Sequence, residues 1–418
     1  MHRPVELPPY SPRPQRAPTA LGGLRVIDFS HFVAGPLCTM MLGDLGADII
    51  KIENSAHGDD MRENDPQIGG IGGPFFWGNR NKRSVALNLR IAEAQAAALE
   101  LIARADVVVE NFSAGVMEKF GLGYESLSKM NPRLVYCAIS AAGRQGILAG
   151  RLGFDPIAQA ESGFMSINGH PNGPAVIAGT PFIDITSGMM ACNAILAALY
   201  ERERSGEGQY VEVAMLDQAI LMLSFKATNY LITGIEPERI GHSSAASAPV
   251  GVYRTRDGGS IYLACASDRT FKRLADALGR ADLVADRRFT RAAERVANRA
   301  ALDVILSETF EQEKRDAMME KLRATGVPAA AVLSVAEALS GPDVGARGLL
   351  SSIPHPTAGA VPNIASPIRM SRTPVVDPIA APPLGYHTDE VLRDILGYDQ
   401  NHIAAMRRNG ALHAEMRE

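Results

Sequence analysis

The sequence predicts an α/β fold built on a parallel sheet, and the order of its apolar segments indicates this. Short apolar runs of strand length alternate with segments of helix length from residue 24 to about 215, a pattern typical of a parallel sheet with helices on both faces. The chain has 418 residues, more than the roughly 250–300 that one hydrophobic core supports, so we expect two domains. Its composition, 46% hydrophobic and 21% charged, is typical of a soluble globular protein.

The predicted elements follow a proline-rich arm, residues 1–20, which we expect to be extended, disordered or wrapped around a neighbouring subunit. Apolar runs predict strands at 24–29, 47–53, 84–89, 107–112, 133–140 and 210–215. Helices are expected from Pro36, over 91–104, before Arg133, from Asp184 to about Arg204, and over 216–232.

The pattern changes between residues 230 and 245, where we place a domain boundary. Turn residues and short strands come first, and helical segments fill 268–324. A proline-rich passage over 353–383 then leads to a last helix at "TDEVLRDILG". Because long irregular segments are uncommon inside a compact domain, we expect this passage to run over the surface or over a partner.

Composition excludes several classes of protein. The formal net charge of −4 argues against a general nucleic-acid binder. The four cysteines form no CxxC pair and have no histidine at metal-ligand spacing, so we expect free thiols in a reducing compartment and no metal site. No run approaches the roughly 18 apolar residues of a membrane span, and the N-terminus lacks a signal-peptide core, so a cytoplasmic protein is expected.

Nucleotide-binding motifs are also missing. The first strand-to-helix turn, "SHFVAGP", contains no GxGxxG, which argues against a standard NAD or FAD site. The run "GGIGGP" (69–74) does not lie between a strand and a helix, and we interpret it as a mobile loop. There is no Walker A sequence.

Asp184 is the most informative single residue. It follows apolar Pro181-Phe182-Ile183, and no other charge occurs before Glu201. Burial of an unpaired carboxylate is costly or raises its pKa, so two roles are open. The Asp184 side chain could cap the following helix by accepting hydrogen bonds from the first backbone N–H groups of that helix, or it could be a nucleophile held at the helix start. The two roles are compatible.

Basic and histidine residues suggest a place for an anionic ligand. Arg80, Lys82, Arg83, Arg90 and Lys119 fall at strand ends or in adjoining loops, and together they could bind a multiply phosphorylated ligand such as coenzyme A. His31 is placed to touch a ligand in the first strand-to-helix loop, whereas His170 is expected to face solvent in a turn. No GxSxG or HExxH motif accompanies these histidines.

Seven segments in order resemble the class III CoA-transferases, the CaiB/BaiF family that includes formyl-CoA transferase and carnitine CoA-transferase. They are "DFSHFVAGPLCTMMLGDLGADIIKIE", "NRNKRSVALNL", "ADVVVENFSAGVMEKFGLGYESL", "NPRLVYCAIS", "GFDPIAQAESG", "GEGQYVEVAMLD" and "PPLGYHTDEVLRDILGY". The resemblance covers about residues 20–400.

This resemblance implies a Rossmann-like large domain whose sheet is formed from both chain ends, 21–230 and 345–418, and a smaller inserted α+β domain, 245–344. It also implies an interlocked homodimer that uses an acyl-CoA and a small carboxylic acid as substrates, without a permanently bound cofactor. By motif, "FIDITSG" makes Asp184 the nucleophile. The implied CoA contacts are His31, Val33, Ala34, Leu89, Arg90, Asn111, Phe112 and Lys119.

The implied reaction is CoA transfer through an aspartyl anhydride and an aspartyl-CoA thioester on Asp184, with backbone N–H groups near the helix start or in a small-domain loop stabilising the oxyanion. The family also contains 2-methylacyl-CoA racemases, which by this resemblance carry His-Asp where this sequence has Phe154-Asp155. Phenylalanine cannot exchange a proton, so transfer is favoured. A non-catalytic CoA-binding protein is the third alternative. Both Phe154 and Asp155 are expected in the substrate pocket.

Departures from formyl-CoA transferase bear on the substrate. Val33 and Asn54 replace its glutamine and its phosphate-binding arginine, and "GHSSAASAP" replaces its glycine-rich loop. A small dicarboxylate is consistent with the polar serines Ser243, Ser244 and Ser247 in that loop.

Overall fold

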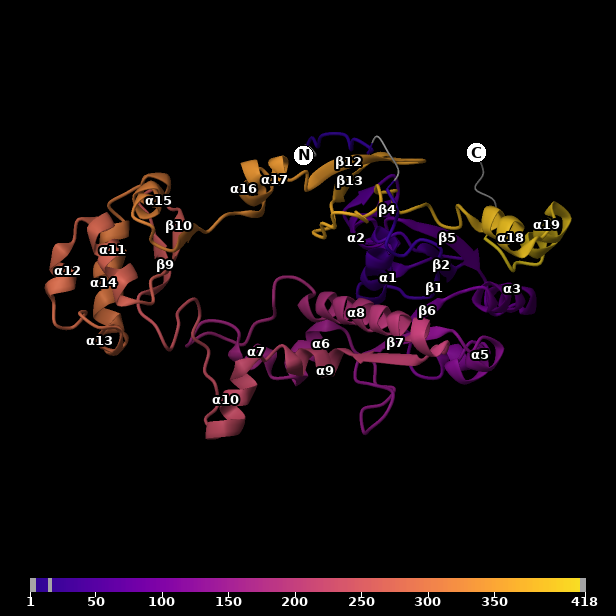
Figure 1. Ribbon diagram of the computed structural model, residues 1–418, viewed down its shortest axis with the longest axis horizontal. Coiled ribbons are helices and arrows are strands. Elements are labelled where there is room, and N and C mark those ends of the chain that lie inside the picture. Colours follow the sequence, from indigo (N-terminus) through magenta and orange to yellow (C-terminus); the bar gives the residue numbers. More distant parts are fainter. Residues whose placement is uncertain (1–4, 14–16, 414–418) are drawn as a thin grey trace. The chain divides into compact units, whose positions relative to one another are not determined.

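A computed structural model describes residues 5–13 and 17–413 (Figure 1). The chain divides into two compact units, each with its own core. The first unit comprises Met1–Phe164, Ile177–Thr228 and Gly345–Glu418, and the second comprises Met165–Val176 and Asn229–Val344.

The first unit is organised around a six-stranded parallel sheet. In spatial order the strands are β5 (Lys82–Leu87), β2 (Asp48–Asn54), β1 (Arg25–Asp28), β6 (Val107–Glu110), β7 (Val135–Ser140) and β8 (Tyr210–Ala214). Numbered along the chain, this is the order 3-2-1-4-5-6 of Rossmann-like folds. The predicted α/β class and all six predicted strands are therefore confirmed.

Helices cover both faces of this sheet, as expected for parallel strands that are apolar on both sides. On one face, Val26 and Val109 pack with α1 (Ala34–Asp44) and α8 (Phe182–Ser205). On the other face, Ile27 and Val108 belong to a core that includes side chains of α3 (Ala92–Ala103), α5 (Tyr124–Met130), α18 (Thr388–Leu396) and α19 (Gln400–Arg408). The sheet is therefore buried on both sides.

The C-terminal segment joins the first unit without adding a strand to its sheet, so the predicted sheet from both chain ends is wrong. Residues beyond 345 form the separate hairpin β12 (Leu350–His355) and β13 (Gly359–Ile364), and then α18 and α19. The proline-rich passage between them cannot supply the N–H donors of a central strand.

The part of the N-terminal arm that the structure describes is ordered by contacts with this segment. Pro9 bridges to Ser352 of β12, and the Tyr10 hydroxyl donates to Asp377 at 2.8 Å. Residues 1–4 and 14–16 lie outside the described residues.

Two local predictions were wrong. The glycine-rich run 69–74 contributes to a small hairpin, β3 (Gln67–Ile68) and β4 (Ile71–Gly72), followed by α2 (Gly73–Gly78). The helix expected over 216–232 is broken into α9 (Met215–Leu221) and α10 (Phe225–Thr233), with Ser224 between them at φ 56°. The short elements η1 (Asp60–Arg62), α4 (Val116–Lys119), α6 (Asp155–Glu161) and α7 (Phe164–Ile167) complete this part of the chain.

The second unit contains the antiparallel sheet β11 (Ala329–Ala331), β10 (Ser260–Ala264) and β9 (Val250–Arg254). Apolar side chains of α11 (Asp268–Leu278), α14 (Arg299–Phe310) and α15 (Arg315–Ala324) pack against it. The remaining helices are α12 (Ala281–Ala285), α13 (Ala292–Ala297), α16 (Val335–Leu339) and α17 (Pro342–Ala346).

Helix α8 is long and apolar enough to cross a membrane by length and composition alone, so the expectation of no such run was wrong. One face of it nevertheless lies in the core of the first unit, where Ala191, Cys192 and Ile195 are each at most 1% exposed. A core helix with this composition passes the same test.

Gly188 sets the close approach of α8 to α1, because a Cβ atom there would lie 2.4 Å from the Ala34 carbonyl oxygen. We expect Gly188→Ala to lower the free energy of unfolding by about 1–3 kcal/mol, since rigid backbone must move. Gly179→Ala is the control, because a Cβ atom there meets nothing within 4 Å. Denaturant unfolding of both variants measures the difference, and equal stabilities would contradict this packing.

Candidate active site

Two neighbouring cavities lie at the carboxyl edge of the parallel sheet, where ligands of such sheets bind. The first, of about 300 Å³, is lined mainly by the ends of β1, β2 and β5 and the loops that follow them. The second, of about 220 Å³, is lined by the loops after β1, β6 and β7 and by Asp184. His31, Phe112 and Val116 line both cavities, so the two form a continuous site within the first unit.

The loops after β1 and β6 are joined at the point where the strand order reverses. The His31 backbone N–H donates to Asn111 Oδ1 at 2.9 Å, and Asn111 Nδ2 donates to the His31 carbonyl oxygen at 2.8 Å. The next residue, Phe32, is in the left-handed region at φ 62°, and its N–H donates to Asp59 at 3.2 Å. These bonds fix the His31 side chain where the two cavities meet.

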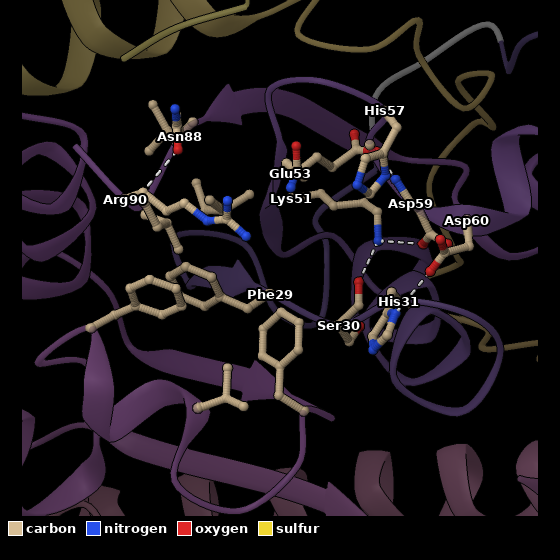
Figure 2. A pocket seen from close by; sticks show the side chains of 18 residues that line it. Phe29, Ser30, His31, Lys51, Glu53, His57, Asp59, Asp60, Asn88 and Arg90 are labelled. Carbon is tan, nitrogen blue, oxygen red and sulfur yellow. Dashed lines mark hydrogen bonds and ion pairs between the residues drawn. The ribbon is translucent and has the colours of Figure 1, made fainter. Parts of the chain in front are cut away.

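The first cavity has charged groups on opposite sides (Figure 2). Lys51 donates to the Ser30 carbonyl oxygen at 2.5 Å and pairs with Asp59 at 2.9 Å, so its charge is compensated. Arg90 is exposed and forms no ion pair within the described residues. It is therefore available to an anionic ligand. Burial lowers the pKa of His31 despite the opposing effect of Asp60, which favours the neutral imidazole.

The cap that we expected from Asp184 is supplied by Asp155, so that prediction was wrong. Helix α8 begins at Phe182, which places Asp184 inside the first turn. Asp155 Oδ2 accepts the backbone N–H of Ile183 at 2.6 Å and that of Asp184 at 3.1 Å. Asp155 is 4% exposed and does not line the second cavity. The Asp184 carboxylate forms no hydrogen bond within the described residues, and it faces the cavity.

The surroundings of Asp184 disfavour its charge. Burial, and then the negative charge of Asp155, raise the pKa of Asp184 from 3.8 to about 7. A carboxylate that is poorly solvated and has no donor retains its nucleophilicity, whereas a capped one shares its lone pairs with backbone N–H groups.

The N–H groups at the start of α8 are not free for an oxyanion, contrary to one of our expectations. The Phe182 N–H donates to Thr180, those of Ile183 and Asp184 donate to Asp155, and that of Ile185 donates to Pro181. Donors for an oxyanion must come from another segment.

Most of the predicted basic cluster is structural, so the prediction that it binds a phosphorylated ligand was wrong for three of its members. Lys82 is buried and pairs with Asp28 at 3.1 Å. Arg80 is also buried and donates through Nε to Asp44 at 2.9 Å. Arg83 pairs with Asp48 at 2.6 Å.

The structure brings together many of the predicted site residues but not all of them. Those that line the two cavities are His31, Ala34, Leu89, Arg90, Asn111, Phe112, Phe154 and Asp184. Val33 is buried at the start of α1, and Lys119 is exposed at the end of α4; neither lines a cavity. The loop that carries Ser243, Ser244 and Ser247 belongs to the second unit, as does His170.

Two arginines of the second cavity, Arg144 and Arg151, were missed by the sequence analysis. Both lie in the loop directly after β7, and a charged residue following a parallel strand is the signal that could have identified them. Among the described residues, no group of histidine, cysteine or acidic side chains could hold a metal ion.

Comparison with known proteins identifies the family. The sequence pattern of CoA-transferase family III matches residues 21–388. This chain belongs to CoA-transferase family III. It is therefore an enzyme of the class III CoA-transferases, as the resemblance implied.

Individual relatives agree with this assignment. The chain is 38% identical to a succinate–glutarate CoA-transferase of Agrobacterium fabrum, over 91% of this chain and 97% of the relative. It is 37% identical to an acetyl-CoA:oxalate CoA-transferase of Acetobacter aceti, over 84% and 88%. A solved CaiB/BaiF family protein from Brucella suis superposes with a TM-score of 0.83 at 36% identity, covering 90% of this chain and 100% of that one.

Proposed function

We propose that this enzyme transfers CoA from a dicarboxylic acyl-CoA to a dicarboxylic acid acceptor, with Asp184 as the nucleophile. The observation that carries the proposal is the Asp184 carboxylate itself, which lines a cavity and accepts no hydrogen bond from any described residue, while Asp155 caps its helix. Relatives named for succinate, glutarate and oxalate support the substrate class. Phe154 lines the same cavity and has no proton to exchange, which disfavours racemisation.

The proposed reaction balances without water, because every group that leaves in one step is the nucleophile or product of another. A carboxylate oxygen of Asp184 attacks the thioester carbonyl carbon, the C–S bond breaks, and CoA leaves as its thiolate. The thiolate then attacks the aspartyl carbonyl of the mixed anhydride, which releases the donor acid as a carboxylate and leaves an aspartyl-CoA thioester. The acceptor carboxylate repeats both steps in reverse and regenerates Asp184.

Positioning must supply most of the rate enhancement, because a carboxylate is a weak nucleophile. A well-oriented pair of reactants gains an effective molarity worth about 7–11 kcal/mol. In this proposal Arg90 and the His31 loop, which line the first cavity, hold CoA, and α8 holds Asp184 in the lining of the second. Partial burial of Asp184 removes water that would hydrolyse the anhydride.

The test is to trap the intermediates. The protein incubated with succinyl-CoA and then hydroxylamine should carry a hydroxamate on Asp184, detected by peptide mass spectrometry. The Asp184→Asn variant is the matched control and should remain unmodified. Modification at another residue, or a wild-type protein that turns over while Asp184 stays unmodified, would overturn the assignment.

The pH dependence of transfer should report the ionisation of Asp184. Only the carboxylate attacks, so we expect kcat/KM to rise with pH and to level off above about 7. In Asp155→Asn the amide oxygen can still accept the helix N–H groups, but the neighbouring charge is lost, so the midpoint should move to lower pH. A midpoint that Asp155→Asn leaves in place would contradict the coupling of these two groups.

We also propose a cytoplasmic, interlocked homodimer. Exposed apolar side chains on α8, such as Met189 at 46% and Tyr200 at 71%, would be covered by a partner subunit. The four buried free cysteines fit a reducing compartment. Light scattering should give twice the chain mass and cell fractionation should find the protein in the cytosol; a monomer or an exported protein would contradict the respective part.

A further inference from the structure

The second cavity contains two arginines that the proposed reaction does not use. Arg144 and Arg151 both line it, and Asp184 is the only acidic residue among the described residues of its lining. CoA transfer at one carboxyl group needs no second charge, so a monocarboxylate would react equally well without these arginines. A dicarboxylate, however, brings a second negative charge into a space that is shielded from water.

Arg144 is held rigidly in place. Its backbone N–H donates to Glu212 Oε1 of β8 at 2.5 Å, and the preceding Gly143 N–H donates to Ser140 Oγ at 3.0 Å. Its guanidinium donates through Nη2 to buried Glu110, and to the Phe112 carbonyl oxygen at 3.3 Å. The side chain is 11% exposed, so little rotamer entropy remains to be lost when a ligand binds.

The same guanidinium has unused hydrogen-bonding capacity. Nε is buried without a hydrogen-bond partner within the described residues. Nη1 lies 3.9 Å from the exposed Glu118 carboxylate, beyond hydrogen-bonding distance. Nη1 is therefore the donor that a ligand carboxylate in the cavity can reach, whereas Nε is enclosed by the protein.

Arg151 is the weaker candidate. Its Nη2 already pairs with Glu161 at 2.5 Å, and its side chain is 47% exposed. An exposed, paired guanidinium contributes little to the binding energy of a further carboxylate.

We infer that Arg144 is the residue that determines specificity for dicarboxylates, binding the carboxylate remote from the reacting carboxyl group in the cavity that ends at Asp184. This inference rests on the proposed function and assigns a binding residue to the carboxylate of the substrate that does not react. Glu110 acts as a positioning residue, since it orients the guanidinium and accepts the Phe112 N–H at 2.9 Å.

The test is a competition between two acceptors of equal length, glutarate and pentanoate, for the same acyl-CoA donor. The ratio of their kcat/KM values then depends only on the acceptor steps. Removal of Arg144 alone would leave Glu110 buried without its partner, so the main variant is Arg144→Gln with Glu110→Gln. We expect wild type to favour glutarate strongly, and this double variant to lower the ratio about 100-fold, chiefly through the loss of glutarate turnover.

Three further variants complete the design. Arg144→Lys keeps the charge but loses the planar fork, and should retain part of the preference. Arg133→Gln removes an exposed guanidinium, 53% exposed, that precedes β7 outside both cavities, and should leave the ratio unchanged. Arg151→Gln should lower the ratio less than tenfold.

The outcomes separate the inference from the proposed function. If wild type transfers CoA to no carboxylate, the proposed function fails and the inference falls with it. If wild type is active but shows no preference for glutarate, or if the double variant keeps that preference, the inference alone is overturned. Loss of the preference in Arg151→Gln would also overturn it, because the second carboxylate would then bind Arg151.

Discussion

The Asp184→Asn variant should lose CoA transfer by a factor of roughly 10⁴ or more while still binding CoA, because the substitution removes the proposed nucleophile and keeps its shape. The structure gives a reason to expect retained folding: Asp155, and not Asp184, caps α8. The measurements are steady-state transfer from succinyl-CoA and calorimetric binding of CoA. A variant that keeps a tenth of the wild-type rate would exclude Asp184 as the nucleophile.

The same substitution should stabilise the protein, in a manner that depends on pH. The pKa of Asp184 is raised in the folded state from 3.8 to about 7, so the ionised group opposes folding. This penalty is absent below about pH 4, grows as the pH rises from 4 to 7, and is complete above about pH 7. Converted in full, this pKa shift would correspond to several kcal/mol of unfolding free energy, but Asp184 is only half-buried and solvent reduces the effect. We therefore expect Asp184→Asn to raise the free energy of unfolding by about 1–2 kcal/mol at pH 8 and to leave it unchanged at pH 4.

A matched control separates these effects from a general loss of charge. Glu207→Gln makes the same carboxylate-to-amide change at an exposed position just after α8. It should alter neither turnover nor the pH dependence of stability. A stability gain of similar size in both variants would mean that the gain reflects net charge and not the site.

The sheet could be predicted from sequence because each strand is short, apolar on both faces and followed by a helix. This periodicity is local, and so is the signal that places His31, Arg90 and Asn111 after strands. The separation into two helix-covered faces, with Val26 on one and Ile27 on the other, follows from the alternation of side chains along a strand.

Interactions between distant residues could not be predicted in this way. The cap of α8 comes from Asp155, 28 residues before the first N–H group that it accepts. Likewise Lys82 pairs with Asp28, 54 residues earlier, and nothing near Lys82 in the sequence indicates that partner. A single sequence shows a charge but not its partner, so it separates a binding cation from a structural one only where the partner is near in sequence.

The buried ion pair beneath the His31 loop should account for the largest stability effect in the first unit. Asp28 is fully buried, and it accepts the Ser30 N–H at 2.9 Å, the Thr39 hydroxyl at 2.7 Å and Lys82 Nζ at 3.1 Å. Burial raises the pKa of Asp28, but the charges of Lys82 and Lys51, together with the hydrogen bonds to the carboxylate, outweigh burial. That pKa is therefore lowered and the carboxylate is ionised. Burial lowers the pKa of Lys82 to about 8, although Asp28 opposes this.

Asp28→Ala should therefore lower the free energy of unfolding by about 3–5 kcal/mol at pH 7, because it leaves the Lys82 ammonium buried without its counter-charge. The loss should shrink above pH 8, where Lys82 can release its proton in the wild type as well. If the His31 loop binds CoA as proposed, CoA should also bind more weakly, because Asp28 holds the Ser30 N–H at the start of that loop. Asp282→Ala, which breaks an exposed pair with Arg280, is the control and should leave the free energy of unfolding nearly unchanged. Denaturant unfolding at pH 7 and 9 measures these differences. Equal losses in the two variants would mean that water reaches Lys82, and that the Asp28–Lys82 pair contributes no more to stability than an ion pair at the surface does.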